Sequence, residues 1–294
     1  MDQMDLKTLR DTPPWEWPKN AGQTFLAILR NRQAKASDRL LAADLAGDFT
    51  VIDDALADAL LSILGDAAEP EELRAQAAIS QGPAIEQAFI DEFDDPDSVP
   101  ISEKTFRKVK QALRKLYLDS SVPKLVRRRI LEAAVRAPEE WHTGAIRSAY
   151  ASEDQEWKLT AVFCMNYVRG FDQQILEALE SAAPEIHYQA VRAAGTREVD
   201  AAWPHVAALL TSAGTSKDLL LAAIEASATI RPREAGALLV DLADSEDEDI
   251  ADAASEAMSM AEGLSDSESD EEDDEDDYGP EDDEDESGNS KTIH

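Results

Sequence analysis

The sequence predicts an all-α fold, a right-handed α-solenoid of about seven helix pairs followed by a disordered acidic tail. A ten-residue pattern recurs at steps of 29 to 53 residues, and a repeat of about this length is typical of helical solenoids. Six of the seven copies have Ala at the fifth position, and the C-terminal segment after them is dominated by acidic residues. The copies begin at Asp38, Leu73, Val126, Trp157, Ile186, Leu219 and Ile250.

Residues 1–17 are expected to form an N-terminal extension or cap, ahead of a repeat region at 18–263. The extension ends in a proline-flanked run, PPWEWP, which contains Trp15 and Trp17. One interpretation is that both Trp side chains cover the exposed end of the first repeat. The alternative is a docking motif that binds a partner protein.

Each repeat is expected to contain two helices, of which the second carries the pattern. In the helix expected at 184–195, Ile186, Ala190 and Val191 follow helical spacing and therefore share one face. Gly195 can adopt the left-handed conformation that ends a helix. The recurrent Ala has a physical reason, because a larger side chain would push closely packed helices apart.

The pattern resembles that of HEAT repeats, on stretches such as Asp38–Gly47 and Leu73–Ala78. The resemblance covers about residues 18–263 and implies an elongated solenoid with an extended binding surface. It says little about function, since one fold hosts many functions. HEAT repeats place a basic residue at the second position of this run. The residues here are Arg39, Arg74, Arg127 and Lys158, followed by His187, Leu220 and Ala251.

An acidic insertion at about 83–102 interrupts the register between the second and third copies. Its second half is rich in proline and acidic residues and is expected to be a surface loop. A calcium site at 94–97 is not predicted, because the run lacks the 12-residue spacing of an EF-hand loop. The insertion has no Lys or Arg, and its acidic residues are Glu86, Asp91, Glu92, Asp94, Asp95 and Asp97.

The third repeat is basic in an otherwise acidic protein. Residues 103–136 have a net charge of +8, whereas the whole chain has −34. One interpretation is that these cations pair with the acidic insertion and neighbouring repeats. The alternative is a patch for an acidic or phosphorylated protein surface, to which the planar fork of Arg is well suited. The eleven bases are Lys104, Arg107, Lys108, Lys110, Arg114, Lys115, Lys124, Arg127, Arg128, Arg129 and Arg136.

We expect the second helices to line the concave side of the solenoid. The candidate partner-binding residues are those basic side chains expected on that side or exposed on the third repeat. They are Arg74, Lys104, Lys108, Arg127, Arg128, Arg129 and Lys158.

Residues 264–294 are expected to be a disordered acidic tail. They contain 16 Asp and Glu and one Lys, without a hydrophobic period. Like charges repel, and no apolar surface offsets the entropy of ordering. The tail is expected to tune solubility or to mask the basic repeat. An alternative is that it acts as an acidic chaperone or buffer of basic proteins by mimicking nucleic acid.

The sequence shows no catalytic constellation, cofactor site or metal site. Helical-repeat metal hydroxylases are built on repeated His-Glu pairs, and this chain has no His-Glu dipeptide. Cys164 lies at a small core position and is interpreted as a buried hydrophobe. HEAT-like repeats also build the lyases that attach bilins to phycobiliproteins and a family of alkylpurine DNA glycosylases. An enzyme related to the bilin lyases is therefore kept as an alternative.

The resulting expectation is a non-catalytic protein–protein interaction scaffold or adaptor that is not an enzyme. Nucleic acid is an improbable partner, because duplex binding needs many Lys and Arg to displace counterions. No apolar run reaches the length needed to span a bilayer, and the start of the chain lacks the features of a signal peptide. A single Cys excludes an intrachain disulfide. The expected location is cytoplasmic.

Overall fold

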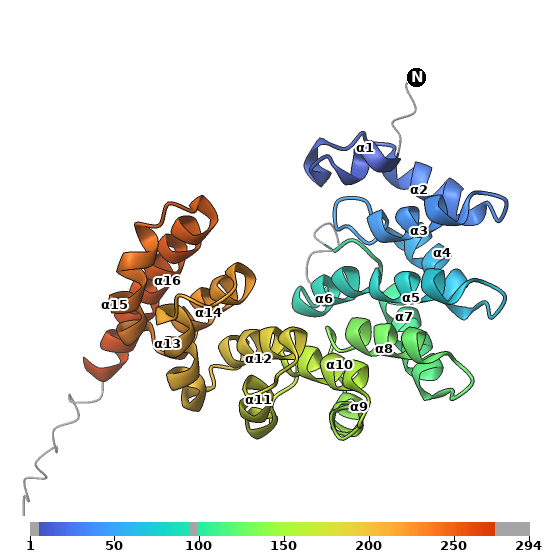
Figure 1. The fold of residues 1–294 in the computed structure, drawn as a ribbon. Helices are drawn as coiled ribbons and strands as arrows, with labels where there is room; N and C mark the ends of the chain where they lie inside the picture. The colour runs from blue at the N-terminus through green and yellow to red at the C-terminus, as the bar shows by residue number, and fades with distance from the viewer. Residues whose placement is uncertain (1–5, 94–98, 274–294) are drawn as a thin grey trace, which may run out of the picture. The chain divides into compact units, whose positions relative to one another are not determined.

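A computed structural model of the chain describes residues 6–93 and 99–273, with side chains up to residue 261, and these residues form helices and no strand (Figure 1). The elements are α1 (Leu6–Arg10), η1 (Pro14–Glu16), α2 (Ala21–Arg30), α3 (Ala36–Leu45), α4 (Asp54–Gly65), α5 (Glu71–Ile79), α6 (Gly82–Ile90), α7 (Glu103–Leu118), α8 (Lys124–Ala134), α9 (Glu140–Tyr150), α10 (Gln155–Met165), α11 (Asp172–Leu179), α12 (Pro184–Thr196), η2 (Asp200–Ala202), α13 (Trp203–Thr211), α14 (Lys217–Ile230), α15 (Pro232–Ala243) and α16 (Glu248–Asp273).

The predicted all-α solenoid of seven helix pairs is confirmed in the part of the chain that the structure describes. The pairs are α2–α3, α4–α5, α7–α8, α9–α10, α11–α12, α13–α14 and α15–α16, and each pattern copy lies on the second helix of its pair. The helices fall into two compact units, Met1–Arg197 and Glu198–His294. Within these described helices, none is long and apolar enough to cross a membrane.

In the first unit, the second helices α3, α5, α8, α10 and α12 pack on one another in chain order and form one layer (Figure 1). The first helices form the other layer. The pattern's Ala residues lie where these helices approach closely, and Ala42, Ala77, Ala161 and Ala190 are fully buried. Ile130, which replaces Ala in the third copy, is also fully buried. The pattern position is therefore a core position in all five copies of this unit, and a small Ala occupies it in four of them.

The second unit contains the last two pairs and packs by the same rule. Ala223 and Ala254 occupy the pattern position and are fully buried. An exposed ion pair joins the start of α14 to the loop before α16, with 2.7 Å between Lys217 Nζ and an Asp247 carboxylate oxygen. The sequence period of about 30 residues thus reappears as a contact between equivalent turns.

The N-terminal extension covers the first pair through only one of its two Trp residues. Trp17 donates its ring N–H to the carbonyls of Leu9 and Thr12, each at 2.9 Å. Its ring packs edge-on against buried Phe25, with centroids 5.5 Å apart. Trp15 is 79% exposed and covers nothing. The cap interpretation therefore describes Trp17 alone.

The acidic insertion begins with a helix, α6, that the periodicity did not predict. The helix packs against α7 and α8, and an ion pair joins Glu86 to Arg136 at the end of α8. After α6, Glu92 and Phe93 take positive φ angles of 48° and 61°, which turn the chain sharply. The acidic residues expected at 94–97 lie outside the described residues.

Helix α16 continues past Gly263 to Asp273, into the segment expected to be a disordered tail. Once a helix has formed, each further residue adds a hydrogen bond at modest cost, so a packed amphipathic helix can extend into an acidic sequence. The predicted disorder of residues 274–294, and the roles assigned to that part of the tail, lie outside the described residues.

Candidate functional site

Three Arg residues at the second pattern position share a structural role. Each donates a hydrogen bond to a carbonyl in the last turn of the preceding helix, where backbone carbonyls lack a helical partner. The bonds run from Arg39 to Leu29 O at 3.1 Å, from Arg74 to Leu64 O at 3.0 Å and from Arg127 to Tyr117 O at 2.9 Å. These three Arg residues therefore connect the two helices of their own pair.

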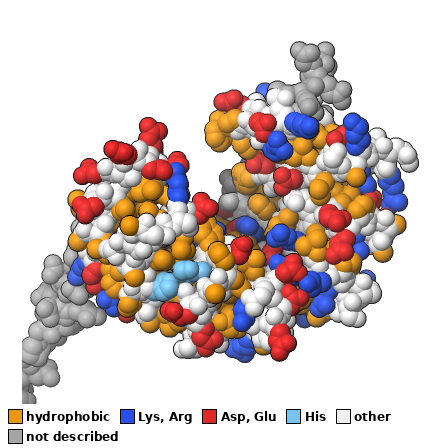
Figure 2. All heavy atoms as spheres, viewed as in Figure 1, with side chains coloured by type: hydrophobic (Ala, Val, Ile, Leu, Met, Phe, Trp, Pro, Cys, Tyr) orange, Lys and Arg blue, Asp and Glu red, His pale blue; other side chains and the backbone are white. Residues whose placement is uncertain are grey.

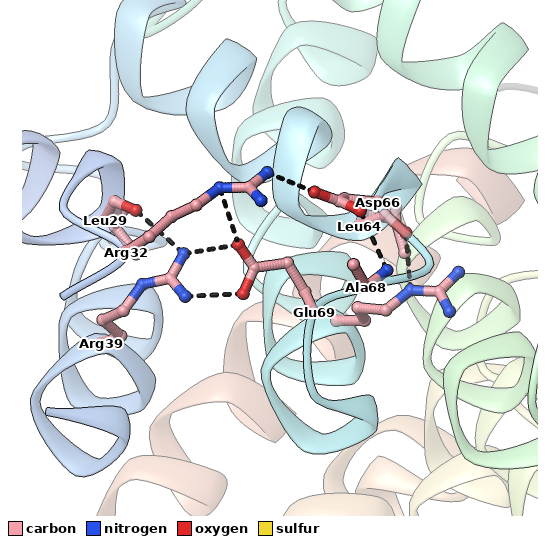
Figure 3. Close-up of polar contacts among 8 residues, drawn as sticks. Leu29, Arg32, Arg39, Leu64, Asp66, Ala68 and Glu69 are labelled. Carbon is pink, nitrogen blue, oxygen red and sulfur yellow. Dashed lines mark hydrogen bonds and ion pairs between the residues drawn. The ribbon is translucent and has the colours of Figure 1, made fainter. Parts of the chain in front are cut away.

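Arg39 also connects the first helix pair to the second. Figure 3 shows Arg39 and Arg32 pointing toward Glu69, which precedes α5. Arg39 binds Glu69 bidentately, with N–O distances of 2.6 and 2.9 Å, and both side chains are buried. The hydrogen bond from Arg39 holds the pKa of Glu69 below its usual value. Arg32 pairs with Asp66 at the exposed edge of this network.

Arg128 is buried between α8 and α10. Its Nε donates to the hydroxyl of Thr160 at 3.0 Å, and another of its nitrogens lies 2.8 Å from a carboxylate oxygen of Glu156. Thr160 in turn donates to buried Glu132 at 2.6 Å, and Arg129 lies 2.5 Å from the same carboxylate. The interpretation of these cations as internally neutralised describes this cluster.

The structure separates the predicted partner-binding residues by exposure. Arg74 and Arg128 are buried, so we correct their assignment as surface contacts. Arg127 lies between the rings of Tyr117 and Trp157, at 5.4 and 5.7 Å from their centroids, and is half-buried. Lys158 is half-buried over Tyr150. The exposed members of the set are Lys104, Lys108 and Arg129.

Helix α7 presents a continuous cationic face. Its N-terminus is capped by the Ser102 hydroxyl, which accepts from Thr105 N at 3.3 Å, and its buried face includes Val109 and Leu113. These residues orient the opposite face toward solvent. We call that face the α7 cationic face, and it consists of the exposed Lys104, Arg107, Lys108, Arg114 and Lys115.

Two of these cations have exposed partners of their own. Lys108 lies 2.6 Å from Asp58, and Arg107 pairs with Glu103 one turn earlier on α7. Arg114 and Lys115 form no ion pair with any residue whose side chain is described. Figure 2 shows Lys and Arg side chains of the first unit interspersed with Asp and Glu. The α7 cationic face thus holds most of the exposed cations of the basic repeat.

A surface cavity of about 570 Å³ opens beside this face, between α7 and the start of α9. It is lined by Arg114, Glu139, Glu140 and Trp141. The ring N–H of Trp141 donates to Glu139 at 2.9 Å, and the ring lies 5.2 Å from that of Tyr117. Trp141 is half-buried, and its position on an apolar stripe does not distinguish such a ring from a fully buried one.

His142 lies directly behind the cavity wall and is almost fully buried. Its Nδ1 accepts the backbone N–H of Glu139 at 2.8 Å, which completes the cap of α9. Burial lowers the pKa of His142 to about 4, so the ring is neutral near pH 7. Arg114 is therefore the cation among the residues that line the cavity, and Lys110 lies 3.5 Å from the carboxylate of Glu139.

No other cluster among the described residues has an evident catalytic arrangement. Cys164 is buried, and burial raises the pKa of its thiol well above the usual value, which disfavours a nucleophilic thiolate. In the described part of the chain, no group of three or more His, Cys, Asp or Glu is placed to hold a metal ion.

Comparisons with known proteins find similar chains among the solved structures only. No family model matches the chain, and no curated protein matches it. Among solved structures, the chain is similar to human deoxyhypusine hydroxylase in complex with glycerol, at 18% sequence identity over 88% of each chain and a TM-score of 0.39.

This finding corrects two expectations from the sequence. The chain was expected to be a non-catalytic scaffold and not an enzyme, whereas the similar protein is an enzyme. Neither expectation is retained. At 18% identity the likeness transfers no residue role to this chain, and its helical-repeat fold rests on its own helices.

Proposed function

We propose that this chain is a HEAT-like repeat protein that recognises an acidic, carboxylate- or phosphate-bearing segment of another protein. The observation that carries the proposal is the α7 cationic face, where five Lys and Arg side chains remain exposed on one helix. Recognition of this kind serves a bound partner and a substrate protein equally well.

Electrostatics favours a local site over general attraction to polyanions. The net charge of −34 repels large polyanions, so only a segment that fits the cationic face gains more than it loses. The ion pairs already present at Lys108 and Arg107 are exposed. Exchanging an exposed pair for a partner's carboxylate costs little, since such pairs contribute about 0–1 kcal/mol.

The test is the binding of a fluorescein-labelled octa-glutamate peptide to the full chain, followed by fluorescence anisotropy. The variant carries Lys104→Glu, Arg114→Glu and Lys115→Glu, which reverse cations without removing a known ion pair. The peptide should bind the variant at least about tenfold more weakly, because three attractive contacts become repulsive. Binding by the unmodified chain should also weaken as NaCl screens the charges.

A matched control reverses three exposed cations elsewhere in the first unit, Lys19→Glu, Arg30→Glu and Lys35→Glu. The control changes net charge by the same amount and should alter the affinity by less than about twofold. Equal losses in both variants would show that overall charge, not the α7 face, controls binding, and the proposal would then be wrong.

A further inference from the structure

We infer that the cavity beside Arg114 receives an aromatic side chain of the acidic segment, so that the recognised sequence combines carboxylates with a Tyr, Phe or Trp. This inference rests on the proposed function, because Arg114 belongs to both the α7 cationic face and the cavity wall. The cavity thereby requires an aromatic residue in the bound segment, whereas the α7 cationic face requires only negative charge.

The Trp141 ring is held in place for stacking. Its N–H is fixed on Glu139, and its ring lies against Tyr117 on one helix and His142 on its own helix, with centroids 5.2 and 3.9 Å away. Because Trp141 is already held in one conformation, binding of a partner ring costs little further side-chain entropy. Trp and Arg are also the residue types that most often dominate binding energy at interfaces.

Charge around the cavity selects against an anion inside it. Glu139 and Glu140 line the same wall as Trp141. Lys110 offsets part of the charge of Glu139, with 3.5 Å between Nζ and the carboxylate, so exposed Glu140 contributes most to opposing a phosphate or carboxylate there. Arg114 lies on α7 and belongs to the α7 cationic face. An acidic segment therefore places its carboxylates along α7 and turns an uncharged ring toward α9.

The occupant is a segment of a partner protein, and its character follows from this charge pattern. A purely apolar segment would leave the α7 cationic face unmatched. A phosphorylated ring would meet Glu139 and Glu140, which adds like-charge repulsion. An unmodified aromatic residue flanked by Asp or Glu satisfies both surfaces at once.

The experiment compares three octapeptides on the full chain by anisotropy. They are octa-glutamate with a central Tyr, with a central Ala and with a central phosphotyrosine. The Tyr peptide should bind about three- to tenfold more tightly than the Ala peptide, the range expected for one aromatic contact. The phosphotyrosine peptide should bind no more tightly than the Ala peptide.

The outcomes separate this inference from the proposed function. Equal binding of the Tyr and Ala peptides would overturn the aromatic requirement while leaving the acidic site in place. Tightest binding by the phosphotyrosine peptide would overturn it as well, since the cavity would then hold an anion. Failure of all three peptides to bind would overturn the proposed function and the inference with it.

Trp141→Leu should reduce the advantage of the Tyr peptide to less than about twofold. Because the ring packs on Tyr117, this variant also needs a labelling test that leaves the packing intact. Glu140→Cys, labelled with a nitroxide, should broaden the NMR signals of the peptide's Tyr ring. Thr8→Cys, an exposed site on α1 at the other end of the same unit (Figure 1), is the matched label and should not. Equal broadening from both labels would contradict the assignment.

Discussion

At the residue scale, the guanidinium of Arg74 binds a carbonyl that helix α4 leaves without a partner. The bond from Arg74 Nε to Leu64 O is 3.0 Å long, and Arg74 is only 6% exposed. We expect Arg74→Met to keep much of the packing volume but to leave that buried carbonyl unpaired. The free energy of unfolding should fall by about 1–3 kcal/mol, as measured by urea denaturation.

Arg30→Met is the comparison for this variant, because Arg30 is exposed at the end of α2. Its effect should stay within about 0.5 kcal/mol. Arg74→Met should also bind octa-glutamate as the unmodified chain does, since the side chain cannot reach a partner. A stable Arg74→Met variant with weakened peptide binding would show that Arg74 contacts the peptide, and its exclusion from the partner-binding residues would then be wrong.

At the element scale, neighbouring second helices approach so closely that some positions admit only Gly. A Cβ built on Gly47, just after α3, would lie 2.8 Å from the backbone oxygen of Ser80 and from its Cβ. Because Ser80 closes α5, neither group can move without shifting a helix. Gly47→Ala should therefore destabilise the chain by about 1–3 kcal/mol.

Gly144→Ala should change the stability of the chain in the opposite direction, toward a more stable fold. Gly144 lies inside α9, and a Cβ there meets nothing within 4 Å. Ala is favoured over Gly in a helix interior by up to about 1 kcal/mol, so this variant should be more stable. If thermal unfolding showed both variants shifting the same way, the close approach of α3 and α5 would not be the controlling factor.

The elements also show what periodicity can and cannot predict. Seven pairs were predictable, because apolar residues at helical spacing recur in each copy and a buried Ala in six of the seven. Helix α6 was not, since it occurs once, between the second and third copies, and therefore adds nothing to the period. The burial of each Arg was equally unpredictable. A basic residue at the second pattern position is expected to be exposed, and only the structure shows the helix end whose carbonyl it binds.

The candidate site was only partly predictable for the same reason. A net charge of +8 over 103–136 indicated the repeat that contains the α7 cationic face. Composition could not separate Arg128, which is buried on Thr160, from Arg114, which faces solvent. The cavity beside Trp141 depends on two helices meeting, and no single stretch of sequence records that.

At the scale of the whole molecule, negative charge is concentrated in the second unit. Residues 198–294 contain 30 Asp and Glu against 4 Lys and Arg, a net charge of −26 out of −34. The first unit carries the remaining −8 and most of the ion pairs that link neighbouring repeats. Self-repulsion should therefore weigh most heavily on α13–α16.

Screening that repulsion should stabilise the second unit more than the first. Raising NaCl from about 10 mM to about 150 mM shortens the Debye length from about 30 Å to about 8 Å. Hydrogen exchange should then slow more in peptides from α14 and α15 than in peptides from α4 and α5. The exposed pair between Lys217 and Asp247 is weakened by the same salt, but one such pair contributes at most about 1 kcal/mol. Faster exchange in α14 and α15 at high salt would mean that pairing outweighs repulsion there, and the charge of −26 would then not limit the unit's stability.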